Sequence, residues 1–312
     1  MSTIGTAPFE LPEELVPGVW RKAQDGSVLA KLSNQEPQKF GIKQYIKLTG
    51  TPRAEVVGES DEKSSSNASF APVRTVQRKL QVTQRFSEEL KWADEDDQIG
   101  ALSTMGDLAG EALSRGLDLV GIHGINPLTG AALSGSPTKL LDTTNVVELT
   151  SGTAATPDLA IEAAYALLVA DGSTPDGIAF DPSFAFTLAT QRDTHDGKRL
   201  YPELGLGKFD NFLGFDAAIS NTVSGGPEVV TASTGVYKDT NPNIKAIVGD
   251  FTAFRWGVQR SIGVTMIEYG DPDGGGDLQR KNEIALRAEV VYGIGFLDLD
   301  SFAVIKDAIA NS

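Results

Sequence analysis

Hydrophobic and polar residues alternate along residues 282–296, near the end of the chain. A period of two is the pattern of a β-strand, and 13 such residues at about 3.3 Å each span ~43 Å. Residues 261–269 read as its partner strand, joined to it through the glycine-rich stretch 270–277. The pattern predicts one very long hairpin. Its alternating apolar positions are Ile284, Leu286, Ala288, Val290, Tyr292, Ile294 and Phe296.

A second long element has helical periodicity. Apolar residues recur every three to four positions between residues 99 and 120, which is typical of an amphipathic helix. The acidic run 94–97 is expected at the N-terminal end of this helix, where the helix dipole favours negative charge. Gly121 and Gly124 are expected to end the helix, which at roughly 25 residues would be ~37 Å long.

The first half of the chain contains a polar excursion between two extended segments. Residues 38–50 and 73–86 read as extended, whereas residues 53–72 are polar, charged and rich in serine. Because an isolated two-stranded ribbon is marginal in water, the excursion needs a partner surface. One parity of the second segment is apolar, at Val76, Leu80, Val82 and Phe86.

The middle of the chain predicts a compact α/β unit. Thr156 and Pro157 form an N-cap and a first-turn proline that open a helix through Ala170, with Gly172 as its stop. Asp181 and Pro182 open another helix, which runs to about Gln191. The short strands expected around these helices are residues 178–180, 228–232 and 245–251.

The first 40 residues do not form a domain of their own. Four prolines leave room for only a short helix at residues 16–24, stopped at Gly26. Apolar side chains such as Phe9 and Trp20 must therefore be buried elsewhere. The body of the same chain and a neighbouring subunit both remain open as that surface.

Composition narrows the possible functions. The 312 residues (33.1 kDa) carry a net charge of −15, and residues 91–312 alone carry −16. Such an acidic body repels phosphate backbones, which argues against sequence-specific binding of nucleic acid. The absence of cysteine excludes disulfides and thiolate metal sites. No apolar run is long enough for a membrane span, and no secretory signal is expected at the N-terminus.

Candidate chemistry is sparse. The two histidines, His123 and His195, are predicted to be solvated loop residues. There is no G-x-S-x-G elbow, and no phosphate-binding loop of the Walker A or G-x-G-x-x-G type. The chain is therefore not expected to be an ordinary enzyme, and no cofactor is expected.

Three short motifs have structural explanations. DPDGGGD (271–277) hints at calcium, but Gly275 stands where the third oxygen ligand of an EF-hand belongs; a plain hairpin tip is expected instead. DEDD (94–97) is better explained as helix-end charge than as a two-metal cluster. The glycines of GIG (293–295) are expected to mark the close approach of another backbone segment. No metal is expected.

Taken in order, these pieces resemble the tailed-bacteriophage major capsid proteins of the Hong Kong 97 fold. The resemblance runs over nearly the whole chain. It is carried by AEVVGESDEKSSS (54–66), QVTQRFSEEL (81–90), the long helix, GINPLTG (124–130), GIAFDPSFAFTLATQRD (177–193), GKRLYPEL (197–204), FLGFDAAIS (212–220), IVGDF (247–251), the long hairpin and RAEVVYGIGFLDLDSFAVI (287–305).

The resemblance implies an α+β fold with an N-arm, an E-loop, a P-domain and a compact A-domain. The implied segments are an N-terminal arm (1–40), the E-loop with its flanking strands (41–86), the P-domain spine helix (87–130), the A-domain (131–257), the long P-domain hairpin (258–296) and a C-terminal return to the A-domain (297–312).

The implied function is that of a major capsid protein. It would assemble with itself as pentamers and hexamers into an icosahedral shell around phage DNA, in the host bacterial cytoplasm, and remain in the virion. Two alternatives stay open, an encapsulin-type nanocompartment shell and an acidic soluble α/β enzyme. No membrane contact is expected, and any weak DNA contact would fall to Arg21, Lys22 and Lys31.

Other features of the family concern assembly partners and covalent chemistry. Met1 lies about 50 residues before the E-loop, so the long propeptide of many members is not expected. A separate scaffolding protein, or none, would guide assembly, with a portal and a decoration protein as further partners.

Some members join an E-loop lysine to an asparagine on a neighbour, with a glutamate as base. Alignment places Lys63, Asn282 and Glu289 at these positions. Asn282 and Glu289 have opposite parity, so a bulge or the hairpin tip would have to bring them together. The alternative is that Lys63 is a solvated loop charge and that Glu289 pairs with a basic residue at a subunit contact.

Overall fold

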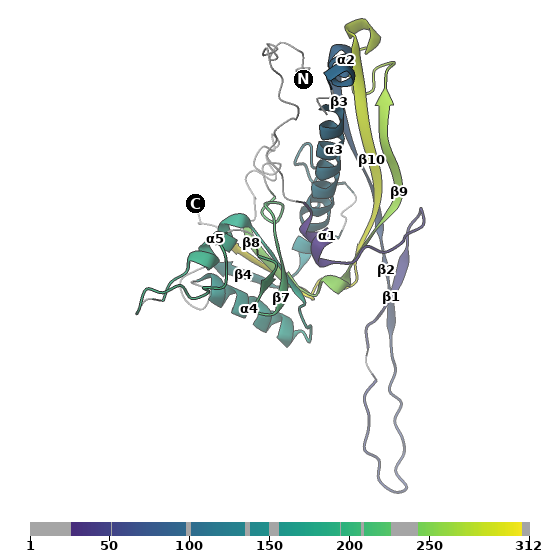
Figure 1. Cartoon of the computed structure of the whole chain (residues 1–312). Coiled ribbons are helices and arrows are strands. Elements are labelled where there is room, and N and C mark those ends of the chain that lie inside the picture. Colours follow the sequence, from purple (N-terminus) through teal and green to yellow (C-terminus); the bar gives the residue numbers. More distant parts are fainter. Residues whose placement is uncertain are drawn as a thin grey trace.

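The computed structural model describes residues 26–50, 52–97, 101–134, 138–149, 156–193, 195–206, 209–225 and 243–307. Figure 1 shows three regions: an elongated part, a compact part beside one end of it, and a narrow ribbon that leads into a long loop pointing away from both. Within the described residues, no helix is long and apolar enough to cross a membrane.

The elongated part is built on a three-stranded antiparallel sheet. Its strands are β3 (Val76–Ser87), β10 (Glu283–Phe296) and β9 (Phe254–Ile267), with β10 in the middle. The long hairpin is confirmed, because β9 and β10 pair from Ala285↔Ile267 to Phe296↔Phe254. A short 3-10 turn, η4 (Gln279–Lys281), lies at the hairpin tip.

Helices cover one side of this sheet (Figure 1). They are α2 (Glu88–Asp97) and α3 (Ala101–Asp118), and α3 continues into a π-helical turn, η1 (Leu119–His123). Gly124 ends the helix as predicted, with φ 66°. The prediction for Gly121 is wrong, since this residue lies inside η1. A Cβ there would come within 2.8 Å of Leu29 Cδ1, so its role is close packing.

The position predicted for the acidic run 94–97 is also wrong. These residues lie within α2, which begins six residues earlier at Glu88, so they do not open the helical segment. The sequence pattern did not separate α2 from α3, and residues 98–100 lie outside the described residues.

The compact part is a six-stranded mixed sheet with helices on one face. In spatial order the strands are β4 (Val146–Leu149), β11 (Phe302–Asp307), β8 (Ile244–Gly249), β5 (Gly177–Phe180), β7 (Phe215–Ile219) and β6 (Asn211–Phe212). The helices α4 (Pro157–Ala170) and α5 (Pro182–Thr190) start and stop as predicted. The predicted strand 228–232 lies outside the described residues. Two 3-10 turns, η2 (Leu140–Asp142) and η3 (Phe251–Ala253), complete the part.

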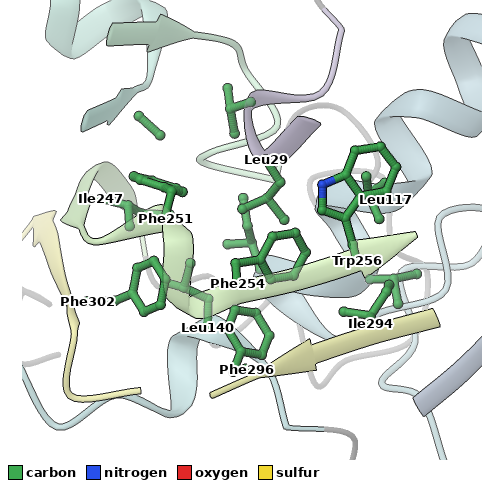
Figure 2. Close-up of a cluster of buried hydrophobic side chains, with 14 of the residues drawn as sticks. Leu29, Leu117, Leu140, Ile247, Phe251, Phe254, Trp256, Ile294, Phe296 and Phe302 are labelled. Carbon is green, nitrogen blue, oxygen red and sulfur yellow. The ribbon is translucent and has the colours of Figure 1, made fainter. Parts of the chain in front are cut away.

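One hydrophobic core joins the two parts. Figure 2 shows Phe254, Trp256 and Phe296 of the long hairpin packed with Phe251 and Phe302 of the compact part. The ring centroids of Phe254 and Phe296 lie 4.9 Å apart, and those of Phe296 and Phe302 lie 6.0 Å apart. A second core fills the space between α4, α5 and the six-stranded sheet.

Residues 26–41 pack on their own chain. The short helix α1 (Val28–Leu32) places Val28 and Leu29 in the shared core. Of the two covering surfaces left open for the first 40 residues, this stretch therefore uses the body of its own chain, because these apolar side chains complete the core of their own subunit. The predicted helix 16–24, like Phe9 and Trp20, lies outside the described residues.

The glycines of the long hairpin mark points of close approach, as predicted, although the nearest atoms at Gly293 and Gly295 belong to side chains and not to the backbone. Residues 35–41 cross the face of the sheet opposite the helices. A Cβ on Gly257 would lie 2.1 Å from the carbonyl oxygen of Glu36, and one on Gly293 would lie 2.0 Å from Gln38 Oε1. Gly295 leaves room for Thr75 in the same way, at 3.1 Å from its Cγ2.

The predicted excursion is present. Strands β1 (Gln44–Leu48) and β2 (Phe70–Arg74) pair antiparallel, from Gln44↔Arg74 to Leu48↔Phe70. They form the ribbon, and the loop between them is the excursion (residues 49–69), which Figure 1 shows extending far from both other regions.

Candidate assembly surfaces

The ribbon presents an apolar face to solvent. Exposed and half-buried side chains alternate along both strands. The exposed parity brings together two cross-strand pairs, Ile46 with Pro72 and Leu48 with Phe70. Ile46 is 73% exposed and Phe70 is 67% exposed. A two-stranded ribbon with such a face is not stable alone in water, so this face requires a covering surface.

The other face of the ribbon is anchored to the same subunit. Lys47 Nζ forms an ion pair with Asp298 at 2.7 Å. At the ribbon's base, the Tyr45 hydroxyl donates a hydrogen bond to Glu36 Oε2 at 2.6 Å, and Lys43 Nζ donates to the same oxygen at 2.9 Å. The hydrogen bond from Tyr45 is the main cause that lowers the pKa of Glu36, and Lys43 and Arg255 add to it. The anchored face fixes the direction in which the apolar face points.

The excursion is polar and organised locally. Ser64 donates two hydrogen bonds to Glu55 Oε2, from Oγ at 2.6 Å and from the backbone N at 3.0 Å. The hydroxyl bond is the main cause that lowers the pKa of Glu55. Lys63 lies beside this turn, and its side chain is exposed. The excursion therefore holds its shape through short-range polar contacts and leaves its outer surface free for contact.

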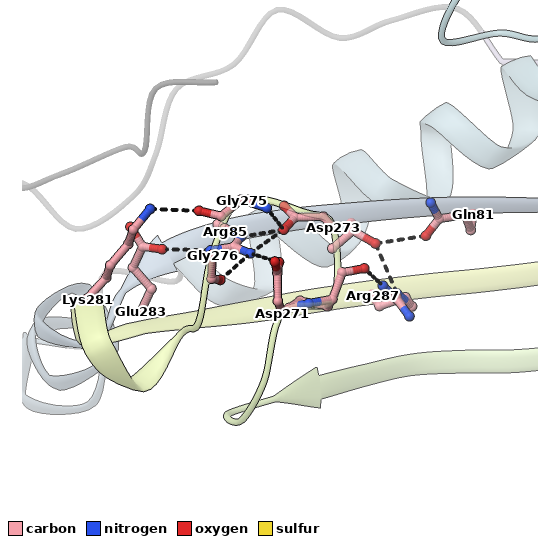
Figure 3. A network of polar contacts seen from close by, with 11 residues as sticks. Gln81, Arg85, Asp271, Asp273, Gly275, Gly276, Lys281, Glu283 and Arg287 are labelled. Atoms are coloured by element: carbon pink, nitrogen blue, oxygen red, sulfur yellow. Dashed lines mark hydrogen bonds and ion pairs between the residues drawn. The ribbon is translucent and has the colours of Figure 1, made fainter.

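The tip of the long hairpin is organised around Arg85 (Figure 3). Arg85 is only 10% exposed and binds three carboxylates, those of Asp271, Asp273 and Glu283, together with the carbonyl oxygen of Gly276. Arg287 Nη2 donates to the carbonyl oxygen of Pro272 at 2.5 Å. The guanidinium of Arg85 therefore occupies the centre of the acidic loop. In the described part of the chain, no group of three or more histidine, aspartate or glutamate side chains has a metal-binding arrangement.

The two histidines differ in environment. His195 lies on an exposed loop as predicted, with 93% of its side chain exposed. The prediction for His123 is wrong: it lies in η1 and is fully buried, with Nε2 3.0 Å from the carbonyl oxygen of Thr222. Burial lowers the pKa of His123 to about 4. The helical periodicity ended at residue 120, so the sequence did not show that the turn after it lies in the core.

The three residues of the expected cross-link are not brought together within one subunit. Asn282 ends the hairpin tip with φ 53°, whereas Glu289 lies seven residues along β10, about 23 Å away in an extended strand. The register shift beside Glu289 lies in the pairing with β9 and does not shorten this distance. Glu289 forms an ion pair with Lys79 of the same subunit at 2.8 Å.

Comparison with known proteins gives the family. The sequence pattern of the phage capsid family matches residues 9–307. The chain belongs to the phage capsid family. A solved chain from Mycobacterium phage Ogopogo is 65% identical, with a TM-score of 0.88 over 98% of this chain and 100% of that one. A chain from Gordonia phage Cozz is 33% identical, with a TM-score of 0.78 over 96% and 92% of the two chains.

More distant structures share the fold. The capsid of a native GTA particle is 14% identical and superposes with a TM-score of 0.64 over 96% of each chain. A search of curated proteins finds no match. The chain is thus a phage capsid protein with a Hong Kong 97-type fold. Its role in the virion is structural, as a subunit that assembles with itself into the shell. Neither the encapsulin nor the enzyme alternative is favoured.

The exposed apolar face of the ribbon was detectable in the sequence only in part. Residues 44–48 alternate, but five residues do not say which parity is covered. The structure decides this, because the pairing of β1 with β2 places Leu48 beside Phe70 on the uncovered side. The hairpin tip showed a misleading calcium-like pattern, since the cation that its carboxylates bind is an arginine 186 residues away in sequence.

Proposed function

We propose that this capsid protein assembles as pentamers and hexamers into an icosahedral head around double-stranded DNA, and that the apolar face of the ribbon is the principal contact between neighbouring copies. The observation that supports the proposal is the exposure of this apolar face in the subunit. Four apolar side chains from two paired strands point away from the rest of the subunit. Burying side chains of this kind stabilises by roughly 1.5–3 kcal/mol each, which the subunit gains on assembly.

The double variant Leu48→Asn with Phe70→Asn tests this contact. The unassembled subunit should keep its stability, because both side chains are already in water, while closed shells should no longer appear by electron microscopy. Leu128→Asn is the control, since Leu128 is also an exposed apolar residue and lies in a turn outside the ribbon. Normal shells from the ribbon variant, or an equal loss in the control, would contradict the proposal.

Further partners follow from the same function. A separate scaffolding protein, a portal and a decoration protein complete the head, which forms in the host cytoplasm. The DNA is enclosed without sequence-specific binding, as expected for a subunit with a net charge of −15. Mass spectrometry of particles isolated before and after DNA packaging would identify such partners. Tight binding of free duplex DNA by the subunit at physiological salt would contradict the proposed mode of enclosure.

A covalent cross-link is a second candidate activity. The Lys63 amine of one subunit would attack the Asn282 side-chain amide carbon of another, forming an isopeptide bond and releasing ammonia. The exposure of Lys63 and the position of Asn282 at a hairpin tip support it. The separation of Asn282 from Glu289 requires the base to come from another copy. Particles boiled in detergent would give ladders on a denaturing gel, abolished by Lys63→Ala. A single band near 33.1 kDa would exclude the reaction.

A further inference from the structure

Asp118, the last residue of α3, is fully buried and binds a different segment of the chain. Its Oδ1 accepts hydrogen bonds from Ser27 Oγ at 2.5 Å and from the Leu29 backbone N at 3.1 Å. Its Oδ2 accepts from the Val28 backbone N at 2.8 Å and from Thr222 Oγ1 at 2.5 Å. One carboxylate therefore joins three segments: the end of α3, the start of α1 and the turn after β7.

The two backbone donors make this contact specific. The first N–H groups of a helix have no partner within the helix, and in α1 those of Val28 and Leu29 point to Asp118. Burial raises the pKa of Asp118, and the four hydrogen bonds oppose the rise. A buried carboxyl with this many donors satisfies both of its oxygens and leaves little freedom in the position of the groups that it binds.

The segment that Asp118 binds continues along all three regions of the subunit. Lys31 forms an ion pair with Asp210 of the compact part. Ser33 Oγ accepts a hydrogen bond from Trp256 Nε1 in β9 at 2.9 Å. Glu36 binds Arg255 of β9 and Tyr45 of the ribbon. We call residues 27–43 the strap, because they contact the compact part, the elongated part and the ribbon in turn.

For a chain that builds a shell as proposed above, we propose that Asp118 is the positioning residue that anchors the strap and thereby fixes the angles between the compact part, the elongated part and the ribbon. The shared core holds these regions together, but apolar contact is non-directional. Hydrogen bonds to a single buried carboxylate have defined geometry. Shell closure requires every copy to present its surfaces at set angles, so loss of the anchor impairs assembly more than folding.

Amide hydrogen exchange on the unassembled full-length chain tests the anchor directly. In Asp118→Asn, the amides of Val28 and Leu29 should exchange at least tenfold faster, while those in the middle of β10 keep their rates. Asp107→Asn is the control, since it makes the same chemical change at an exposed position of α3. Unchanged exchange at Val28 and Leu29 would overturn the proposal, as would equal acceleration throughout the chain.

A distance measurement tests the angular role. The chain has no cysteine, so spin labels can be placed at Glu162→Cys in the compact part and Thr265→Cys in the elongated part. Asp118→Asn should broaden or shift the distribution of distances between the labels, and shells should become fewer or irregular. If Asp118→Asn does not fold, Ser27→Ala and Thr222→Val each remove one donor and should give the same effects in smaller degree.

A distribution that stays as narrow as that of the parent chain in all three variants would overturn the role of Asp118 as an anchor. Failure of the parent chain itself to form shells would instead contradict the proposed function. In that case the exchange rates and the label distances would still decide whether Asp118 sets the geometry of the subunit.

Discussion

The ribbon and the compact part are built from strands with the same alternation of side chains, but they differ in what covers those strands. In the compact part, β5 is buried on both faces, because α4 and α5 cover one face and the elongated part, with α1, covers the other. In the ribbon, one parity contacts the strap and Asp298, and the other parity is uncovered. Under the proposed function, a strand pattern without a covering layer in its own chain marks a surface for another copy to cover.

The difference separates two kinds of stability. The apolar side chains of the compact part are buried when the chain folds, so each contributes to the free energy of unfolding. Those of the ribbon are exposed in the subunit and contribute only when copies meet. The same type of side chain should therefore give opposite results in folding and in assembly experiments.

The largest expected effect compares two phenylalanines. Phe302→Ala removes a fully buried ring that packs on Phe251 and Phe296, so we expect a loss of about 3–5 kcal/mol in the free energy of unfolding. Phe70→Ala in the ribbon should change it by less than about 0.5 kcal/mol yet reduce shell yield. Denaturant unfolding of the subunit and particle counts measure the two effects. A destabilised Phe70→Ala subunit would mean that the ribbon is covered within its own chain.

Sequence patterns predicted the elements that follow from local rules. The strict alternation gave the long hairpin, and proline after an N-capping residue gave the starts of α4 and α5. Gly293 and Gly295 were correctly interpreted as points of close approach. Each of these signals is contained in a window of a few residues.

What the sequence could not predict depends on contacts between distant segments. His123 follows the last apolar position of the helical pattern, and the turn at Thr222, 99 residues later, packs against it. In the sequence, Asp118 has no feature that distinguishes it from an exposed charged residue of a helix. Its burial follows from the hydrogen bonds that Ser27 and Leu29 donate to it. The sequence indicated that the excursion needs a partner surface. Which side chains of the ribbon are exposed could be decided only from the pairing of β1 with β2.

A comparison of the two histidines is expected to give the next largest effect. His123 has a pKa of about 4 in the folded chain against 6.5 as its ordinary value. Below pH 6.5 the unfolded chain takes up a proton that the folded chain does not, so stability is complete above pH 6.5 and falls as pH drops towards 4. The loss is about 3 kcal/mol.

Denaturant unfolding between pH 4 and pH 7 measures this loss. His123→Gln should reduce the slope of stability against pH in that range, while His195→Gln, on an exposed loop, should keep the slope of the parent chain. Equal slopes in the parent and His123→Gln would mean that His123 accepts a proton without leaving its place in the fold.

Alanine substitutions at two glycines allow a crowded and an open surface of the elongated part to be compared. Gly257→Ala places a methyl group where the backbone of Glu36 crosses β9, so the strap must shift, at a cost of about 1–3 kcal/mol. Gly110→Ala, in α3, meets no atom within 4 Å and should gain up to about 1 kcal/mol because alanine favours the helix. Thermal unfolding of both variants measures the contrast. A neutral Gly257→Ala would show that the strap moves freely on the sheet.

The smallest expected effect concerns the ion pair between Lys79 and Glu289 on the open face of the three-stranded sheet. Lys79 is 55% exposed and Glu289 14% exposed, so water and salt screen much of their attraction. Lys79→Ala should therefore lower the free energy of unfolding by less than about 1 kcal/mol, and by still less at high salt. Denaturant unfolding at two salt concentrations, with Lys79→Gln as a variant that keeps polar packing, measures the difference. A loss comparable to that of Phe302→Ala would mean that this polar face is as tightly packed as the compact part, and the contrast between covered and open regions of the subunit would fail there.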